Sequence, residues 1–340
     1  MIESTLPAIE DRLEYLNENR LPAVIAPEGS ERLVDLLGHP REELDGVLAR
    51  HGAILFRGFG LRTPEEFHQA SSAVFGNGMH DYAGGASPRG QVRPGVFEST
   101  RVPAPFCIPQ HHEMSYMPDP PRRLAFFCET APREGGETPL ADSRKIYGLI
   151  PEDVRAEFEA KGIRYHRYLY GPRWNLHHRT RNRFIRLYTS WMHTFSTTDR
   201  EMVERYWAEH GGSVQWDREG GARIANLLPA TRPHPETGEK LWFNHVAVFL
   251  SSPRSTGWLP WLGYHLAYPN PLRRPFHAEF GDGTPIRHAH IDAIRGAIDA
   301  ATVKFRWQRG DLLLVDNFLV THGRMPFRGE RKILVAISAS

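Results

Sequence analysis

The chain of 340 residues has few cysteines and no marked excess of either charge. Its two cysteines, Cys107 and Cys128, exclude a disulfide framework and a cysteine-rich zinc module, and as free thiols they favour a reducing compartment. Lys and Arg number 42 against 40 Asp and Glu, a formal net charge of +2. This balance removes the basic surface typical of nucleic-acid-binding proteins, so we expect no nucleic-acid partner.

The sequence also lacks a secretory signal and a segment suited to a bilayer. The first 20 residues carry acids from position 3 onward and contain no apolar core. The longest uncharged stretch, 255–272, contains three prolines, which indicates a loop and not a membrane helix. We therefore expect a cytoplasmic protein with no membrane partner.

No internal repeat, low-complexity tract or linker divides the chain, so the sequence predicts a single domain over residues 1–340. Within it, a helical region is expected at about 1–50. A helical and loop insertion with a basic, aromatic middle is expected at about 151–232. We interpret the arginines of this insertion as a solvated helical cover; a lid over an anionic or carrier-tethered substrate is the alternative.

Apolar patterning predicts more strands than helices. Helices are expected at 41–51, 63–75 and 197–210. Strands rich in β-branched and aromatic residues are expected at 53–59, 123–130, 240–250, 303–308, 311–317 and 332–338. Because these strands do not alternate regularly with helices, the predicted fold class is mainly β, a jelly roll with flanking helices, and not a doubly wound parallel sheet.

A His-x-Glu sequence is the sharpest local chemical signal. Residues i and i+2 of an extended strand share a face, so His111 and Glu113 can present an imidazole and a carboxylate to one cavity, while His112 points the other way. A further imidazole would complete the two-histidine, one-carboxylate set that holds Fe(II) with open positions. His322, after a predicted strand, is the candidate. The tripeptide alone is also compatible with solvated histidines and a surface acid.

Ordered motifs beyond the tripeptide strengthen this interpretation. The motifs are GAILFRGFGL (52–61), YAGGASPRG (82–90), HHEMSYM (111–117), GGETPLADS (135–143), HPETGEKLWFN (234–244), GDGTPI (281–286) and GDLLLVDNFLVTHGRMPFRGER (310–331). In this order the chain resembles the TauD/TfdA family of Fe(II)- and 2-oxoglutarate-dependent dioxygenases, within the clavaminate-synthase-like superfamily. Within the family, it is most similar to the SyrP-like branch. The resemblance implies a double-stranded β-helix, the jelly roll of these enzymes.

The resemblance also implies cofactors and residue roles. His111, Glu113 and His322 match the family's iron ligands, so Fe(II), 2-oxoglutarate and O2 are the expected cofactor and cosubstrates. Thr138 matches the position whose hydroxyl meets a 2-oxoglutarate carboxylate. An arginine shortly after the distal histidine binds the far carboxylate, and Arg331 fits best, with Arg328 and Arg324 as alternatives.

Substrate contacts are the least determined part. The segment before the iron motif would form a wall of the site, which makes Tyr82, Arg89 and Glu98 candidates, and Asn244 is a candidate from a later predicted strand. An arginine would pair with an amino-acid carboxylate and a glutamate with its ammonium group. The expected partner is a small, amino-acid-like molecule, free or presented by a carrier protein. The oligomeric state is left open.

The expected reaction is hydroxylation of an unactivated C–H bond of an amino acid, peptide or carrier-tethered aminoacyl unit in natural-product biosynthesis. Glu113 disfavours halogenation, because related halogenases replace the acidic ligand by a small residue. Desaturation, cyclisation or oxidative rearrangement at the same centre is the first alternative. A non-catalytic jelly-roll sensor of a small acid is the second, and a zinc hydrolase the third.

Overall fold

A large, mostly antiparallel sheet forms the centre of the computed structural model, which describes residues 9–38, 41–76, 78–79, 90–100, 102–171 and 189–339. In spatial order its strands are β1 (Glu14–Tyr15), β2 (Ala23–Ile25), β3 (Ala53–Phe56), β17 (Leu312–Asp316), β7 (Arg123–Thr130), β20 (Lys332–Ile337), β5 (Val96–Glu98) and β4 (Gln91–Arg93). The predicted strands at 53–59, 123–130, 311–317 and 332–338 are thereby confirmed.

A second sheet packs against the first and carries several of the candidate site residues. Its strands are β16 (Thr302–Phe305), β9 (Thr138–Asp142), β18 (Val320–Arg324) and β6 (Ile108–His111). Phe126, Leu313 and Val335 of the large sheet share one buried cluster with Leu140 and Phe305 of the second. This pair of facing sheets with flanking helices confirms the predicted jelly-roll class.

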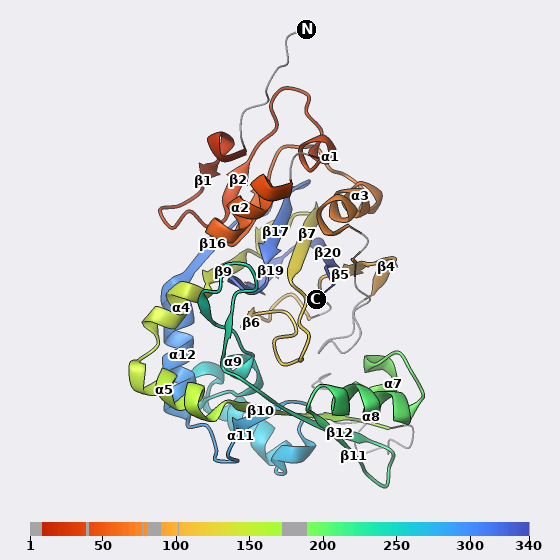
Figure 1. Cartoon of the computed structure of the whole chain (residues 1–340), viewed down its shortest axis with the longest axis vertical. Helices are drawn as coiled ribbons and strands as arrows, with labels where there is room; N and C mark the ends of the chain where they lie inside the picture. Colours follow the sequence, from red (N-terminus) through yellow and green to blue (C-terminus); the bar gives the residue numbers. More distant parts are fainter. Residues whose placement is uncertain are drawn as a thin grey trace.

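The opposite face of the large sheet is covered by helices near the N-terminus (Figure 1). These are α1 (Leu33–Leu36), α2 (Arg41–His51) and α3 (Pro64–Phe75). Thr63 and Glu66 form a capping box at the start of α3. Because both faces of the sheet are buried, its central strands are continuously apolar, and alternate residues enter different clusters: Leu312 and Leu314 on one side, Leu313 and Val315 on the other.

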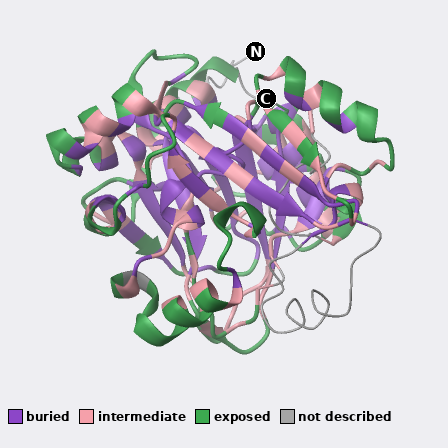
Figure 2. Ribbon diagram, turned by 90° about the horizontal axis from the view of Figure 1, so that it is seen from below, coloured by how far each residue is buried: buried purple, intermediate pink, exposed green. Residues whose placement is uncertain are grey.

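The segment expected as an insertion contributes strands as well as helices. α5 (Glu152–Lys161) opens it, and α7 (Trp191–Thr194) and α8 (Arg200–Glu209) follow. A separate sheet has the order β11 (Ser213–Trp216), β12 (Ala222–Leu228), β10 (Ile163–Leu169) and β15 (His277–Phe280). Figure 2 shows buried strands at the centre of the molecule and exposed helix faces around them.

Two expectations about local structure are wrong. The predicted strand 240–250 divides into β14 (Lys240–Trp242) and α9 (Val246–Phe249), because the Asn244 side chain accepts the N–H of Val246 and turns the chain. The stretch 255–272, expected as a loop, contains α11 (Trp258–Ala267). Pro260 lies in the first turn of this helix, where its missing N–H removes no hydrogen bond.

The remaining elements complete the described chain. They are η1 (Ile9–Arg12), β8 (Glu134–Gly135), α4 (Ser143–Leu149), β13 (Thr231–Pro233), α10 (Pro253–Thr256), η2 (Pro271–Arg273), α12 (His288–Ala301) and β19 (Phe327–Arg328). Both cysteines are free thiols, as expected. Across the described ranges, every helix is too short or too polar to cross a membrane.

Candidate active site

Two neighbouring strands of the second sheet bring the distant histidines together. β6 pairs with β18 so that His111 lies opposite His322, and their ring centroids are 4.5 Å apart. Gly323 follows at an irregularity in the register, where a Cβ would lie 2.6 Å from the carbonyl oxygen of Ile108. The glycine therefore permits the close approach of the two strands beside the histidine pair.

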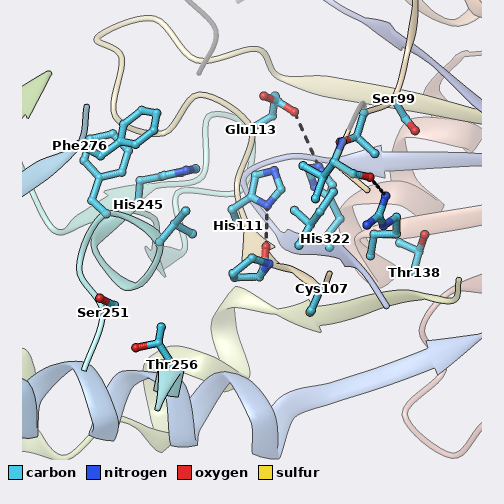
Figure 3. Close-up of a pocket in the computed structure, with 18 of the residues that line it drawn as sticks. Ser99, Cys107, His111, Glu113, Thr138, His245, Ser251, Thr256, Phe276 and His322 are labelled. Carbon is cyan, nitrogen blue, oxygen red and sulfur yellow. Dashed lines mark hydrogen bonds and ion pairs between the residues drawn. The ribbon is translucent and has the colours of Figure 1, made fainter. Parts of the chain in front are cut away.

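Glu113 lies just beyond the end of β6 and joins the pair. Its Oε2 is 3.8 Å from Nε2 of His322, and one ligand atom from each of His111, Glu113 and His322 lies within 4.8 Å of the others (Figure 3). Among the residues that the structure describes, this is the one such group of three or more potential metal-binding side chains.

The chemistry of this group fits Fe(II). Two imidazoles and one carboxylate form the set that holds non-haem iron and leaves positions open. Nδ1 of His111 lies 2.8 Å from the carbonyl oxygen of Pro109, so Nδ1 donates and orients the ring to bind a metal through Nε2. Nδ1 of His322 is buried and has no hydrogen-bond partner in the described part of the chain.

Asn317 holds the backbone of Glu113 in place. Its Oδ1 accepts the N–H of Glu113 at 2.7 Å, and its Nδ2 donates to the carbonyl oxygens of Glu113 at 2.9 Å and Pro121 at 2.8 Å. Asn317 itself is fully buried and follows β17, on the chain segment that leads to His322. The carboxylate-bearing turn is therefore fastened to the segment that carries the second histidine.

His112 points away from the group, as expected, and is buried behind it. Its Nδ1 lies 2.6 Å from the carbonyl oxygen of Asn317, and its Nε2 lies 3.1 Å from the carbonyl oxygen of Trp242 and 3.2 Å from Oγ of Ser143. Burial lowers the pKa of His112 to about 4. The neutral ring donates from one nitrogen to a backbone carbonyl oxygen, and the Ser143 hydroxyl can donate to or accept from Nε2.

A cavity of about 510 Å³ opens beside the three side chains. Much of its wall is apolar or aromatic, and α9, α10 and α11 all contribute to it. Its lining includes Tyr116, Phe126, Phe249, Trp261, Tyr264 and Phe276. This is the size and character typical of a small-molecule site.

Thr138 lines this cavity at the start of β9. Its hydroxyl oxygen accepts a hydrogen bond from Nε1 of Trp307 at 3.0 Å, and both side chains are buried. Because Trp307 can only donate, the proton of the Thr138 hydroxyl remains available for an acceptor in the cavity.

Three arginines follow His322, and the structure places them differently. Arg331 lines the cavity, donates from Nε to the carbonyl oxygen of Gly136 at 3.3 Å, and has no ion-pair partner among the described residues. Burial, and to a lesser extent Arg324, lower its pKa to about 10. Arg324 also lines the cavity, but it donates to the carbonyl oxygens of Val102, Pro103 and Phe106.

Arg328 has a surface environment. Its side chain is 78% exposed and lies 3.5 Å from Glu134. Arg331 therefore lines the cavity with only its Nε bound to a backbone carbonyl group in the described chain, whereas both terminal nitrogens of Arg324 donate to carbonyl groups.

The expected substrate contacts have mixed placements. Tyr82 and Arg89 lie outside the described residues. Glu98 lies at the end of β5, one residue before the cavity-lining Ser99. Asn244 is buried, and its amide donates to the carbonyl oxygen of Ala230 at 2.8 Å.

His245, which sequence analysis missed, lines the cavity next to the proposed metal ligands. Its ring centroid lies 5.5 Å from that of His111, and its pKa is held well below the ordinary value, mainly by burial. Its signal in the sequence is weak: it directly follows Asn244 in a stretch that was predicted to be a strand.

Comparison with known proteins agrees with this arrangement. The model of the taurine catabolism dioxygenase TauD, TfdA family matches residues 20–337. The chain belongs to this family. Membership confirms the resemblance found in the sequence, and it makes the protein an Fe(II)- and 2-oxoglutarate-dependent dioxygenase.

Two curated relatives can be aligned with most of this chain. The dapdiamide synthesis protein DdaC of Enterobacter agglomerans is 34% identical over 303 residues, which are 88% of this chain and 84% of DdaC. A clavaminate synthase-like protein of Arabidopsis thaliana is 30% identical over 352 residues, covering 99% of this chain and 98% of the relative.

Solved structures share the fold at low sequence identity. AAD-2, in complex with Mn(II) and N-oxalylglycine, matches with a TM-score of 0.56 at 14% identity, covering 96% of both chains. PvcB of Pseudomonas aeruginosa, an Fe, alpha-ketoglutarate-dependent oxygenase from an isonitrile synthetic pathway, matches with a TM-score of 0.51 at 14% identity. The latter match covers 94% of this chain and 86% of PvcB.

Proposed function

We propose that this dioxygenase hydroxylates an unactivated C–H bond of an amino-acid-like substrate in a natural-product pathway. The substrate is a free amino acid, a peptide or an aminoacyl unit on a carrier protein. The observation that carries the proposal is the His111, Glu113 and His322 group beside a cavity of about 510 Å³. The relation to DdaC, named for dapdiamide synthesis, supports the pathway class.

In this proposal, His111, Glu113 and His322 hold Fe(II), and Arg331 and Thr138 bind the far carboxylate of 2-oxoglutarate. When bound there, iron with 2-oxoglutarate and O2 supplies the oxidising power that breaks a C–H bond. The Arg331 guanidinium gives charge-assisted hydrogen bonds, and Thr138 adds its hydroxyl proton, since Trp307 occupies an oxygen lone pair. Arg324 supports the wall by holding the carbonyl groups of residues 102–106.

The cavity wall sets where the substrate carbon lies. Aromatic side chains exclude water from the space beside the ligands, and placement within a few ångströms of the reacting centre is the positioning requirement of such chemistry. Tyr82, Arg89, Glu98 and Asn244 remain proposed substrate contacts. Because Glu113 supplies a carboxylate ligand, we do not propose halogenation.

Turnover of 2-oxoglutarate tests this function directly. The protein is loaded anaerobically with Fe(II), given 2-oxoglutarate and O2, and screened against free amino acids, N-acylated amino acids and short peptides for succinate release. A product heavier by one oxygen supports hydroxylation, whereas loss of two hydrogens indicates desaturation or ring closure. Absence of succinate release with every compound would contradict the proposal and favour a binding protein.

A further inference from the structure

His245 is held in one orientation in the cavity wall. Its backbone N–H donates to the hydroxyl of Tyr165 at 2.8 Å. Its ring lies edge-to-face against His111, Tyr116 and Phe249, with centroid distances of 5.5, 5.0 and 5.3 Å. Figure 3 shows the imidazole beside His111 and Phe276 within the cavity. The side chain is 5% exposed, so its polar atoms have few possible partners.

Ser115 determines which nitrogen of His245 carries the proton. Oγ of Ser115 lies 3.1 Å from Nδ1 of His245 and 3.3 Å from the carbonyl oxygen of His112. The hydroxyl has one proton, and the carbonyl oxygen can only accept. If Ser115 donates to His112 and accepts from Nδ1–H, both contacts are hydrogen bonds. The opposite tautomer would set a hydroxyl lone pair against the carbonyl oxygen.

With the proton on Nδ1, the lone pair of His245 is on Nε2. We propose that Nε2 of His245 accepts a hydrogen bond from a neutral N–H group of the substrate, beside the carbon that is oxidised. The inference rests on the proposed function and narrows its substrate class.

The lining favours an acylated amine or peptide N–H over a free ammonium group. Among the described lining residues, Glu113 supplies the one carboxylate, and it is already assigned to the metal. An ammonium group placed here would be buried without an acidic partner, which is costly, whereas an amide N–H needs only one acceptor. Tyr116, Phe249 and Phe276 offer apolar surface to the rest of such a substrate.

Nitrogen NMR of the full-length, metal-free protein tests the tautomer without any turnover. Histidine rings are labelled with ¹⁵N, and His245→Gln identifies the His245 signals by their loss. We expect Nδ1 to have the shift of a protonated nitrogen and Nε2 that of an unprotonated one. Ser115→Ala should shift this pattern toward a mixture of tautomers. A protonated Nε2 in the unsubstituted protein would overturn the inference.

Substrate discrimination tests the role. Each N-acylated amino acid that stimulates turnover is compared with its N-methyl counterpart, which lacks the N–H. We expect N-methylation to raise KM about tenfold in the unsubstituted enzyme, the size of one lost hydrogen bond. In His245→Leu the difference should shrink to less than about twofold, whereas His245→Gln, whose amide oxygen can accept, should retain part of it.

The outcomes separate the two proposals. If no compound supports turnover, the proposed function is contradicted. The NMR experiment still decides the tautomer of His245 in that case. Turnover in which His245→Leu keeps the full preference for N–H compounds, or in which free amines are preferred to acylated ones, contradicts this inference alone.

Discussion

At the scale of single residues, the metal site depends on side chains with few hydrogen-bonding options. Nδ1 of His111 is occupied by the carbonyl oxygen of Pro109, and His112, the next residue, is occupied on both ring nitrogens. The two adjacent histidines therefore have different roles: His111 faces the proposed metal site, and His112 is hydrogen-bonded behind it. The alternation of side chains along an extended chain could predict this difference, but the partners of each ring come from distant segments.

Removal of a proposed iron ligand should abolish the reaction. His111→Ala or Glu113→Ala leaves two of three ligands, and we expect Fe(II)-dependent release of succinate to fall below detection. Circular dichroism should show an unchanged fold, because neither side chain is part of the apolar core. Full activity in either variant would contradict the assignment of the ligands.

Removal of Arg331 should weaken the binding of 2-oxoglutarate. Loss of a charge-assisted contact costs about 1.5–3 kcal/mol, so Arg331→Ala should raise the KM for 2-oxoglutarate more than about tenfold. Arg328→Ala is the matched control, because that side chain is 78% exposed, and its KM should stay within about twofold. The reverse result would move the cosubstrate site to Arg328.

Asn317 should affect metal affinity without touching the metal. Asn317→Ala removes three hydrogen bonds that hold Glu113 and Pro121, and it leaves the Glu113 N–H buried. We expect Mn(II) affinity, measured by calorimetry, to fall about tenfold or more, and the free energy of unfolding to fall by about 1–3 kcal/mol. Unchanged Mn(II) affinity in a destabilised variant would show that Asn317 supports only the fold.

At the scale of elements, a glycine next to the antiparallel pair β8–β19 positions Arg331. Gly136 has φ of +70°, and a Cβ there would lie 2.7 Å from Cγ of Pro132 and 3.2 Å from Cδ of Arg331. Gly136→Ala should therefore destabilise the protein by about 1–3 kcal/mol and raise the KM for 2-oxoglutarate. Urea unfolding and steady-state kinetics measure the two effects.

The helix α4 offers a control glycine. A Cβ at Gly148 would meet no atom within 4 Å. Gly148→Ala should stabilise the protein by about 0.5–1 kcal/mol and leave the KM unchanged. If Gly136→Ala and Gly148→Ala change the KM for 2-oxoglutarate equally, Gly136 has no local effect on Arg331.

Sequence reasoning succeeded for elements whose pattern is local. The strand at 123–130 is apolar on both faces and bounded by turn residues, and the structure gives it the same limits. The stretch 240–250 was misjudged, because a side-chain cap from Asn244 and the Tyr165 hydroxyl, neither visible as a pattern, bend the chain after β14. The helix α11 was missed because the prolines of 255–272 indicate a loop, whereas Pro260 lies in the first turn of the helix and the other two follow its end.

At the scale of the whole molecule, acid should destabilise the fold through histidines that are neutral when folded. Burial lowers the pKa of His277 and of His112 to about 4, from an ordinary 6.5. Between these values the unfolded chain binds protons that the folded chain does not, so the free energy of unfolding falls as the pH falls from 6.5 to about 4. Each such histidine contributes about 1.4 kcal/mol per pH unit within that window.

Urea unfolding across this pH range measures the effect. We expect the slope of stability against pH to become smaller in His277→Phe, because one histidine with a lowered pKa is gone. An unchanged slope would show that His277 is charged in the folded protein or is already neutral when unfolded.

Some residues of the site could be predicted from the sequence and others could not. The two histidines, Glu113, Thr138 and Arg331 could be proposed from ordered motifs, and the structure brings all five to one cavity. Asn317, Trp307 and His245 could not, because their importance comes from contacts with residues more than a hundred positions away. The spacing of neighbouring residues in the sequence does not predict such long-range contacts.

The sheet register sets His111 opposite His322. Because of it, the cavity wall can change in evolution while the metal ligands do not. The ligands stay in place as long as β6 and β18 remain neighbours, whatever lies on the chain between them. Much of the cavity wall, including α9 and α11, belongs to that intervening chain. Mutation, insertion and deletion there can give descendants of this protein new substrates while the oxidative centre is inherited intact.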